Sequence, residues 1–314
     1  MPVVHVVVVA YNRRALLEEA LAAISAQTQR ADAIHVIDNA STDGTSEMVR
    51  SRFPDVMLHA LPANTGGAGG FAAGLAHALD AGADLVWLMD DDTVPTPDAL
   101  QHLLTAHRDC PGSSPVLVAS RVIWTDGRDH PMNTPRRRPG VDATKVAQAK
   151  VVGCVPIRSA SFVSVLVDAD AVRQVGLPEA EFFIWNDDFE FTTRLLRRAR
   201  GLYCPASVVE HRTKVFGSTN IDPGERFYFE VRNKVWTFTR SDGLTFPEKL
   251  LYGGSTLRRW TKTFAASDNR SVLRSGLRRG LLDGLRRAPK DPVAVLAESG
   301  IDVPRPNSGT TGDH

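Results

Sequence analysis

The sequence has few cysteines and no long run of apolar residues. Its 3 cysteines are Cys110, Cys154 and Cys204. Their odd number and wide spacing argue against a disulfide framework and against a thiolate zinc site, and they indicate a reducing compartment. No run of about 18 apolar residues occurs, so no segment is expected to span a bilayer. The valine-rich start has no basic region before it and predicts a strand, not a signal peptide. These absences predict a cytoplasmic protein.

Charge of either sign is not in excess, because 37 Lys and Arg residues face 36 Asp and Glu residues, for a net charge of +1. With 43% apolar residues, this balance is typical of a globular chain that buries a sizeable core. The basic residues form no known nucleic-acid-binding motif, so nucleic acid is not expected as a partner. The length fits one large α/β domain with an appendage, or two small domains.

Strand-like and helix-like segments alternate along the first third of the chain. Apolar β-branched runs predict strands, and apolar residues at helical spacing predict helices. Strands are expected at residues 3–9, 33–37, 56–61 and 85–89, and helices at 15–26, 46–52 and 72–81. Four such alternations favour a doubly wound, mostly parallel sheet, in which ligands bind beyond the carboxyl ends of the strands.

The rest of the chain continues the α/β pattern less regularly. Helices are expected at 97–107, 169–176 and 189–200, and strands at 116–124, 161–168 and 207–209. Residues 125–150 are polar and proline-containing, which predicts a surface loop. This loop either covers a substrate or is simply solvated.

The strand predicted at 85–89 runs directly into three carboxylates, Asp90, Asp91 and Asp92. At an effective dielectric constant of about 20, each pair of adjacent like charges costs on the order of 4 kcal/mol. A cation at this strand end would remove that cost, and carboxylates without thiols suit Mg²⁺ or Mn²⁺. The alternative is an Asp-rich turn that caps the next helix.

Polar residues also follow the other predicted strands. They are Asn12 and Arg13, then Asp38 and Asn39, then Asn64 with the glycine run 66–70. Polar groups from four strands are therefore expected to converge on one crevice. The glycine run either presents backbone amides to an anion or packs closely against another element. It follows the third strand and lacks the G-x-G-x-x-G register, so a dinucleotide-dependent dehydrogenase is disfavoured.

A second acidic pair, Asp187 and Asp188, lies between aromatic residues at the start of a predicted helix. Acids in a first helical turn interact favourably with the helix dipole. A carboxylate beside aromatic side chains also gains a raised pKa, as a general base requires. Both interpretations stay open. His211 follows the last predicted strand, and a lone histidine is more often structural than a metal ligand.

Taken in order, these segments resemble glycosyltransferase family 2, the inverting enzymes with the GT-A fold. The matching segments are Val9–Asn12, Asp38–Thr45, Asn64–Gly67, Asp90–Asp92 and Asp187–Asp188, within residues 3–215. Segments 64–71 and 226–233 are similar to bacterial rhamnosyl- and galactofuranosyltransferases of cell-wall assembly. The resemblance implies an α/β GT-A fold: a Rossmann-like nucleotide-binding half at 1–93 with a mostly parallel sheet, and an acceptor half at 94–215.

The resemblance also implies roles for single residues in transfer from a nucleotide-diphosphate donor. Candidates for nucleotide binding are Tyr11, Asn12, Arg13, Asp38, Asn64, Gly66, Gly67, Asp90 and Asp91. Candidate ligands of a divalent cation, Mn²⁺ or Mg²⁺, are Asp90, Asp92 and His211. Asp188 matches the catalytic base, and Trp185 and Asp187 are expected to support it or to contact the acceptor. The implied donors are UDP-galactofuranose and dTDP-rhamnose, and the implied acceptor is a glycan or a polyprenyl-linked glycan.

Residues 216–290 predict a basic helical extension, and residues 291–314 predict a disordered tail. Cationic and apolar residues interleave between positions 247 and 290. Such helices either lie on the inner face of an anionic membrane or pack on the catalytic domain or a second subunit. A homo-oligomer is compatible with the second arrangement.

Two other functions were weighed against transfer. A nucleotidyltransferase would generally need a basic glycine-rich loop near the first strand, and Ala10–Asn12 does not provide one. An inactive scaffold that binds a sugar or lipid would have no need of Asp90, Asp92 and Asp188. A metal-dependent transferase of cell-envelope polysaccharide synthesis is therefore the leading prediction.

Overall fold

The computed structural model describes residues 2–216 and 222–305. Its strands are β1 (Val4–Ala10), β2 (Ala33–Asp38), β3 (Met57–Ala60), β4 (Leu85–Asp90), β5 (Thr93–Pro95), β6 (Leu117–Ile123), β7 (Arg136–Arg137), β8 (Val155–Ser159), β9 (Ser164–Asp168) and β10 (Gly201–His211). Within these residues they form one ten-stranded sheet in the order β3-β2-β1-β4-β9-β6-β10-β8-β7, with β5 paired to β10. The pairs among β1 to β4 are parallel, as is β6 with β10. The pairs that involve β5, β7, β8 or β9 are antiparallel.

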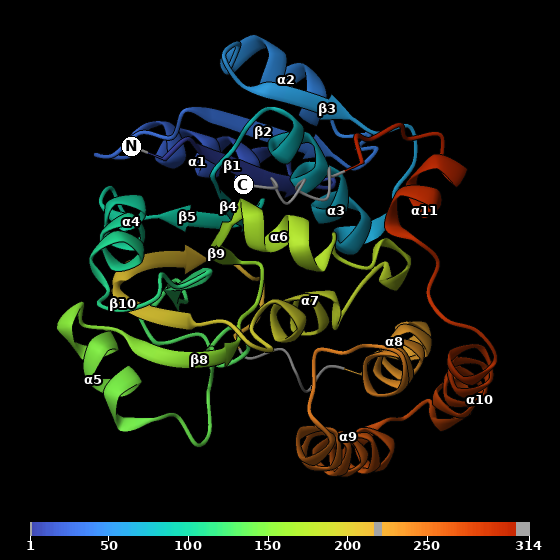
Figure 1. Cartoon of the computed structure of the whole chain (residues 1–314). Coiled ribbons are helices and arrows are strands. Elements are labelled where there is room, and N and C mark those ends of the chain that lie inside the picture. Colours follow the sequence, from blue (N-terminus) through green and yellow to red (C-terminus); the bar gives the residue numbers. More distant parts are fainter. Residues whose placement is uncertain (1, 217–221, 306–314) are drawn as a thin grey trace.

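Helices cover both faces of this sheet (Figure 1). One face packs against α1 (Arg14–Ser25), α2 (Thr45–Arg52), α4 (Ala99–Asp109) and α5 (Ala143–Val151). The other packs against α3 (Gly66–Asp80), α6 (Ala169–Val175), α7 (Asp187–Leu195) and α11 (Pro292–Glu298). The fully buried strands β1 and β4 lie between these layers, so apolar side chains point into a core on each side. The predicted α/β class, with its mostly parallel first half, is confirmed.

A group of three helices lies at one end of the molecule (Figure 1). It consists of α8 (Phe227–Thr239), α9 (Phe246–Ala266) and α10 (Arg270–Arg286). Gly280 and Gly284 of α10 pack directly on α8, where an added Cβ would lie 2.8 Å from Val231 and 2.7 Å from Val235. The prediction of a helical extension is therefore confirmed, and α10 packs on protein. Among the described helices, none combines the length and the apolar composition that crossing a membrane requires.

Helix α9 is tied to the sheet by a buried ion pair. Arg158 of β8 is 2% exposed, and its Nε lies 2.7 Å from Oε1 of Glu248 in the first turn of α9. Glu248 also completes a capping box with Thr245. Burial opposes ionisation of Glu248, but Arg158 and Thr245 outweigh it and lower its pKa to about 2. The Arg158–Glu248 ion pair therefore links the sheet to the helical extension, in addition to the covalent connection between them.

Three local predictions are wrong. Residues 125–150 are not only a loop, because they contain β7 and most of α5. Strand β8 was not predicted at all, because Pro156 and buried Arg158 interrupt its apolar pattern. The tail at 291–314 is not disordered throughout, because α11 folds back on α3 and buries Leu296. Residues 306–314 lie outside the described residues.

A chain of histidines crosses the edge of the sheet under α3. His35 Nε2 lies 3.1 Å from His5 Nδ1, and His35 Nδ1 lies 3.1 Å from His59 Nε2. The His59 ring in turn stacks on His77 of α3 at 4.0 Å. Burial lowers the pKa of His35 to about 3 and that of His59 to about 4, and neighbouring histidines add to the effect. Asp32 and Asp84 face His5, and Asp80 and Asp302 face His77.

This chain predicts a specific loss of stability in acid. The folded pKa of His35 lies below the unfolded value, so the unfolded state binds more protons between pH 6.5 and about 3. Stability is therefore fully present above pH 6.5 and falls as the pH drops toward 3, by about 1.4 kcal/mol for each unit between the two pKa values. Urea unfolding between pH 7.5 and 4.5 measures this slope. His35→Gln is expected to flatten it, whereas the control variant His102→Gln on α4 should keep it; equal slopes in all three proteins would contradict the prediction.

Candidate active site

The carboxyl ends of β1, β2 and β4 meet at one edge of the sheet. In the parallel register Ala10 lies opposite Asp38, and Val9 lies opposite Asp90. The residues that follow these strands therefore enter the same space. The structure brings the predicted polar groups together, as expected from strand ends in a parallel sheet.

Asp90, Asp92 and His211 form a compact group of potential metal ligands. One ligand atom from each lies within 4.8 Å of the others. The antiparallel pairing of β5 with β10 sets His211 opposite Thr93, directly after the acidic segment. His211 Nε2 lies 3.1 Å from Asp92 Oδ1, and His211 Nδ1 lies 2.9 Å from Asn133 Oδ1.

These three residues fit a divalent cation. Because His211 Nδ1 donates its hydrogen to Asn133 Oδ1, the neutral ring has its lone pair on Nε2. This is the usual tautomer of a histidine ligand. Within the described part of the chain, Asp92 Oδ1 is buried without a hydrogen-bond donor, so it faces that lone pair. Burial lowers the pKa of His211, but the Asp92 and Asp90 carboxylates outweigh it and raise the pKa above its ordinary value. The gap between the two atoms therefore attracts a positive charge, either a proton or a metal ion.

Arg13 and Asp91 form the wall beside this group. The Arg13 Nη1 atom lies 3.1 Å from Asp91 Oδ1 and also donates to Asp92. Asp91 Oδ2 accepts the backbone N–H of Tyr11 at 3.0 Å. Burial raises the pKa of Asp91 to about 7, although Arg13 opposes this. Asp91 therefore fixes the loop after β1, while the Tyr11 side chain stays 45% exposed beside the site.

Asp38 and Asn12 join two loops at the same edge. Asp38 is 2% exposed; its Oδ1 accepts the Ser41 N–H at 2.9 Å and its Oδ2 accepts the Ser46 hydroxyl. Asn12 has a φ of 51°, and its Oδ1 accepts the Thr42 N–H at 2.8 Å. The side-chain oxygens of both residues therefore hold the loop after β2 in place.

The glycine run lies within α3 and packs against the segment before α7. Gly66 has a φ of +70°, and a Cβ there would lie 1.9 Å from the Phe183 carbonyl oxygen. A Cβ on Gly70 would lie 2.5 Å from a methyl group of Val9. Of the two interpretations left open, the geometry favours close packing for these glycines. Gly67 alone has open space around it.

Residues 183–186, which we call the 183–186 loop, hold a strained backbone before the acidic pair. Phe183, Trp185 and Asn186 have φ values of 63°, 66° and 68°, a region that costs non-glycine residues on the order of 1 kcal/mol each. Asn233 of α8 stabilises it, because its Nδ2 donates to the carbonyls of residues 182, 184 and 185 at 2.9, 3.0 and 2.9 Å. Asn186 Nδ2 in turn donates to Glu230 Oε2 at 2.8 Å. Strain held in this way is typical of functional loops.

Asp187 and Asp188 begin α7 at the end of this loop. Burial raises the pKa of Asp187 well above its ordinary value, and the charge of Asp188 adds to this. Burial also raises the pKa of Asp188, against the opposing effects of the Phe189 N–H, Lys234 and Arg136. The Asp188 carboxylate lies near enough to contribute to the raised pKa of Asp90, which burial and Asp92 bring to about 6. The acidic pair and the cation group thus share one site.

Residues 5–167, which are more than half of the chain, match the family described as glycosyl transferase family 2. The chain belongs to this family. It is 31% identical over 202 residues to the galactofuranosyltransferase GlfT1 of Mycolicibacterium smegmatis. This match covers 62% of this chain and 66% of that protein. The predicted family and the predicted glycosyltransferase activity are confirmed.

Solved structures of low sequence identity share the fold. S. aureus TarS has a TM-score of 0.63 at 15% identity; the match covers 95% of this chain and 52% of TarS. The chain therefore spans about half the length of TarS. The mannosyltransferase PcManGT of Pyrobaculum calidifontis, in complex with GDP-Man and Mn²⁺, has a TM-score of 0.52 at 20% identity, with 95% and 79% of the two chains covered. The GT-A fold of this glycosyltransferase is thus confirmed.

Asn233 is expected to matter for turnover in this family 2 enzyme. Asn233→Ala removes a donor from three carbonyls, of which, among the described residues, only that of Phe182 keeps other donors, such as the Ile184 N–H; each buried carbonyl left unpaired costs about 1–3 kcal/mol. We expect a lower melting temperature and at least a tenfold lower kcat, because the 183–186 loop loses its conformation. Thr237→Val, one turn along α8 and also buried, is the control. Unchanged kcat in Asn233→Ala would contradict the prediction.

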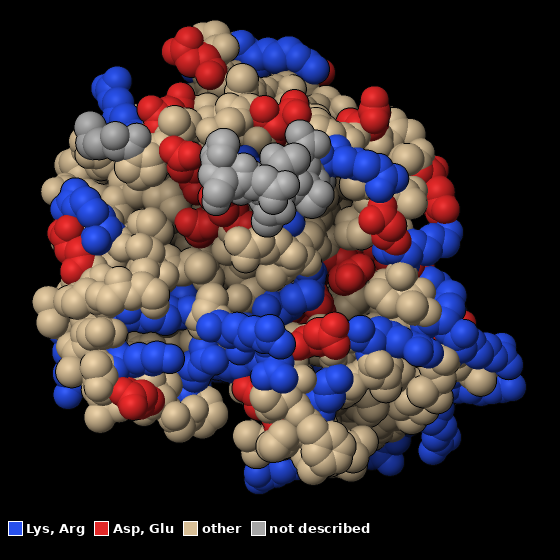
Figure 2. Space-filling view, viewed as in Figure 1, with Lys and Arg blue, Asp and Glu red and all other residues tan. Residues whose placement is uncertain are grey.

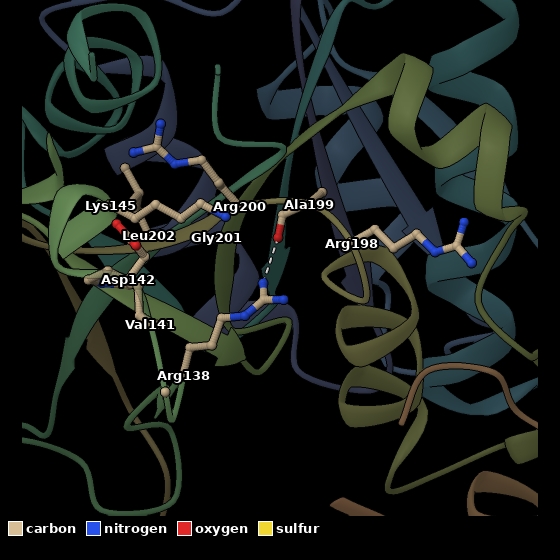
Figure 3. A pocket seen from close by; sticks show the side chains of 11 residues that line it. Arg138, Val141, Asp142, Lys145, Arg198, Ala199, Arg200, Gly201 and Leu202 are labelled. Atoms are coloured by element: carbon tan, nitrogen blue, oxygen red, sulfur yellow. Dashed lines mark hydrogen bonds between the residues drawn. The ribbon is translucent and has the colours of Figure 1, made fainter. Parts of the chain in front are cut away.

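A cavity of about 240 Å³, whose lining is drawn in Figure 3, is separate from this site. Its lining includes Gly201, at the opposite end of β10 from His211, which is roughly 30 Å away along the strand. Arg138 donates from this lining to the carbonyls of Leu196 and Ala199 at 3.1 and 2.7 Å. That guanidinium therefore holds the turn after α7, and the cavity has no part in the transferase site.

Several site residues were not predicted. Asn133 lies in a segment without a pattern, and only the fold brings it to His211. Asn233 and Glu230 lie in the segment 226–233, which the family resemblance marked without giving a role. Lys234 directly follows that segment; its Nζ lies 4.3 Å from the ring centre of Phe189, and burial lowers its pKa to about 8.

Proposed function

We propose that this glycosyltransferase is a metal-dependent inverting enzyme that transfers galactofuranose from UDP-galactofuranose to a hydroxyl group of a glycan. The observation that carries the proposal is the cation group of Asp90, Asp92 and His211 beside the acidic pair of α7. The GlfT1 relative favours galactofuranose over rhamnose as the transferred sugar. The acceptor belongs to cell-envelope polysaccharide synthesis, as a glycan or a lipid-linked glycan.

In this proposal the metal and the nucleotide bind to different residues of the site. Asp90, Asp92 and His211 would hold Mn²⁺ or Mg²⁺, which when bound stabilises the negative charge on the leaving nucleotide diphosphate. The exposed ring of Tyr11 would stack on the base, and Arg13 and the amide of Gly67 would contact the diphosphate. Five further residues support this site by fixing the loops around it: Asn12, Asp38, Asn64, Gly66 and Asp91.

Asp188 acts as the general base. It takes the proton from the acceptor hydroxyl while that oxygen forms a bond to the anomeric carbon, and the bond from this carbon to the diphosphate breaks on the opposite face. The raised pKa makes Asp188 a stronger base, while Lys234 and Arg136 favour its ionised form. Asp187 is buried behind it and, with Trp185, shapes the loop that presents it. In this proposal residues 1–93 bind the nucleotide and residues 94–215 present the acceptor.

A thermal-shift panel of UDP-, dTDP- and GDP-linked sugars with Mn²⁺, Mg²⁺ or EDTA tests this function. A donor at about 100 times its Kd adds roughly 2.7 kcal/mol to stability. We expect a shift with UDP-galactofuranose that EDTA abolishes. A nucleotidyltransferase would also respond to UTP or dTTP, which are run beside the panel, and an inactive scaffold would show no metal dependence. No response to any donor would overturn the proposal.

We also propose that α9 contacts the surface of an anionic membrane. Its side chains Phe246, Leu250, Leu251 and Leu257 are 73%, 63%, 64% and 61% exposed. Lys and Arg side chains spread over the lower half of Figure 2, both over the C-terminal helices and over the catalytic domain beside them. Helix α9 itself carries Lys249, Arg258, Arg259 and Lys262. Apolar side chains among cations are typical of helices that lie on anionic bilayers. The enzyme would then act at the inner face of the cell membrane.

Flotation with phosphatidylglycerol vesicles at moderate salt tests this contact. The full chain is expected to float with the vesicles, and a variant with Leu250→Glu and Leu257→Glu is expected to stay at the bottom. Met57→Glu, an exposed apolar position on β3, serves as the control. Equal flotation of both variants, or none by the native chain, would refute the membrane contact.

A further inference from the structure

A groove of about 620 Å³ joins the active site to the helical extension. Its lining includes Arg13 and Asn186 from the active site, and Trp260 and Thr263 from α9. Arg226 and Phe227, at the start of α8, also line it. The volume lies within the range of about 300–1,000 Å³ that is usual for ligand pockets. A ligand in this groove would reach the acidic pair and the C-terminal helices together.

The lining combines flat aromatic surfaces with cations. Trp185 is 36% exposed, and Trp260 packs edge-on against Phe227 with ring centres 5.9 Å apart, so its indole is held in place. The C–H face of a sugar ring is apolar and fits the face of such an indole. Among the described residues, the Arg226 side chain has no hydrogen-bond or ion-pair partner. A guanidinium of this kind suits a phosphate group.

Glu230 connects the groove to the catalytic residues. Its Oε1 accepts the Trp260 indole N–H at 3.2 Å and also pairs with Arg259. Its Oε2 accepts Asn186 Nδ2 at 2.8 Å. Asn186 directly precedes Asp187 and Asp188. One buried carboxylate therefore positions both an aromatic wall of the groove and the loop that presents the base.

We propose that this groove binds the acceptor, and that the acceptor is a glycan with sugar rings on Trp185 and Trp260 and a phosphate group at Arg226. Glu230 is a positioning residue that couples the acceptor to the 183–186 loop. This assignment rests on the proposed transferase function and names the substrate class of its second site. The phosphate belongs either to a lipid-linked diphosphate or to a soluble glycosyl phosphate.

Transfer assays with four synthetic probes test the groove. The probes are octyl β-galactofuranoside, octyl α-rhamnoside and the 1-phosphates of the two sugars. Trp260→Ala is expected to raise KM for all probes at least tenfold, with the donor Kd from isothermal titration unchanged. Arg226→Gln is expected to raise KM for the phosphates alone. A preference of the native enzyme for the sugar 1-phosphates over the octyl glycosides indicates a soluble glycosyl phosphate. A lower KM for octyl glycosyl phosphates, assayed beside the four probes, than for the free 1-phosphates indicates a lipid-linked one.

Two control variants separate recognition from folding. Phe264→Ala removes a ring that packs on Phe227 but does not line the groove, so it should lower the melting temperature as Trp260→Ala does and leave KM unchanged. Arg278→Ala removes an exposed arginine of α10 and should leave both values unchanged. Equal KM in Trp260→Ala and Phe264→Ala would overturn the assignment, as would a native enzyme that binds none of the probes.

The positioning role of Glu230 has its own readout. Glu230→Ala is expected to lower kcat about tenfold and to raise the acceptor KM, with donor binding unchanged. Glu230→Gln keeps one acceptor oxygen, which serves either Asn186 or Trp260, and is therefore expected to restore part of kcat. If the native enzyme shows no metal-dependent binding of any donor, the transferase function itself is refuted. Metal-dependent donor binding together with unchanged acceptor kinetics in these variants would refute only the groove.

Discussion

Asp188→Asn is expected to lower kcat by about 10²–10⁴-fold, the usual contribution of a general base, and to leave the donor Kd nearly unchanged. The amide keeps the size of the side chain, but it cannot take the proton from the acceptor hydroxyl. Because Asp188 begins α7 beside Asp187, loss of its charge also relieves the repulsion that raises the pKa of Asp187. The variant should therefore fold normally, and its melting temperature should equal or exceed that of the native protein.

The measurement pairs initial rates of transfer with donor titration. Asp170→Asn on α6, whose side chain is 82% exposed, provides a matched Asp-to-Asn control and should retain the native kcat. A loss of donor affinity in parallel with the loss of turnover would place Asp188 in the donor site and refute its role as the base. Native turnover in Asp188→Asn would do so more directly.

Asp92→Asn is expected to abolish metal-dependent donor binding. Asp92 faces His211 across the gap that attracts a positive charge, and it also accepts from Arg13. An amide is a weak ligand for Mn²⁺, so Mn²⁺ affinity should fall by at least about 100-fold, more than the loss of a residue behind the ligands causes. The donor Kd measured with Mn²⁺ should then equal the value measured with EDTA.

Electron paramagnetic resonance of free Mn²⁺ provides a readout that is independent of turnover. Asp98→Asn, before α4 and 52% exposed, is the control and should bind Mn²⁺ as the native protein does. Native Mn²⁺ affinity in Asp92→Asn would remove Asp92 from the proposed ligands. If Asp92→Asn binds the donor more tightly in EDTA than in Mn²⁺, the interpretation changes: Arg13 alone would then bind the diphosphate.

The sequence predicted the first half of the fold well because its signals there are local. The valines of β1 and the apolar run of β4 form buried strands, and the polar residues after them must share one edge in a parallel sheet. The candidate cation ligands could be named for the same reason. The family resemblance added His211 to these ligands and assigned Asp188 as the catalytic base, two roles that the positions of these residues left undecided.

The remaining parts depend on contacts between distant segments. Asn133 reaches His211 only because residues far apart in the chain meet at the end of β10, and its own segment has no periodicity. The 183–186 loop cannot be predicted from its aromatic residues, because Asn233 and Glu230 determine its backbone from α8. The role of the glycine run was open for a similar reason, since only the position of Phe183 explains Gly66.

The return of α11 to the first layer has a consequence for synthesis on the ribosome. Leu296, Ile301 and Val303 belong to the same core as Val7 and Val9, so the hydrophobic layer beneath α3 is completed by nearly the last described residues. A nascent chain that has emerged only as far as α10 still exposes this apolar surface, and contacts of such sequence separation form slowly. We therefore expect stable folding of the N-terminal half to wait until α11 has left the ribosome, and until then the exposed apolar surface suits chaperones that bind such segments.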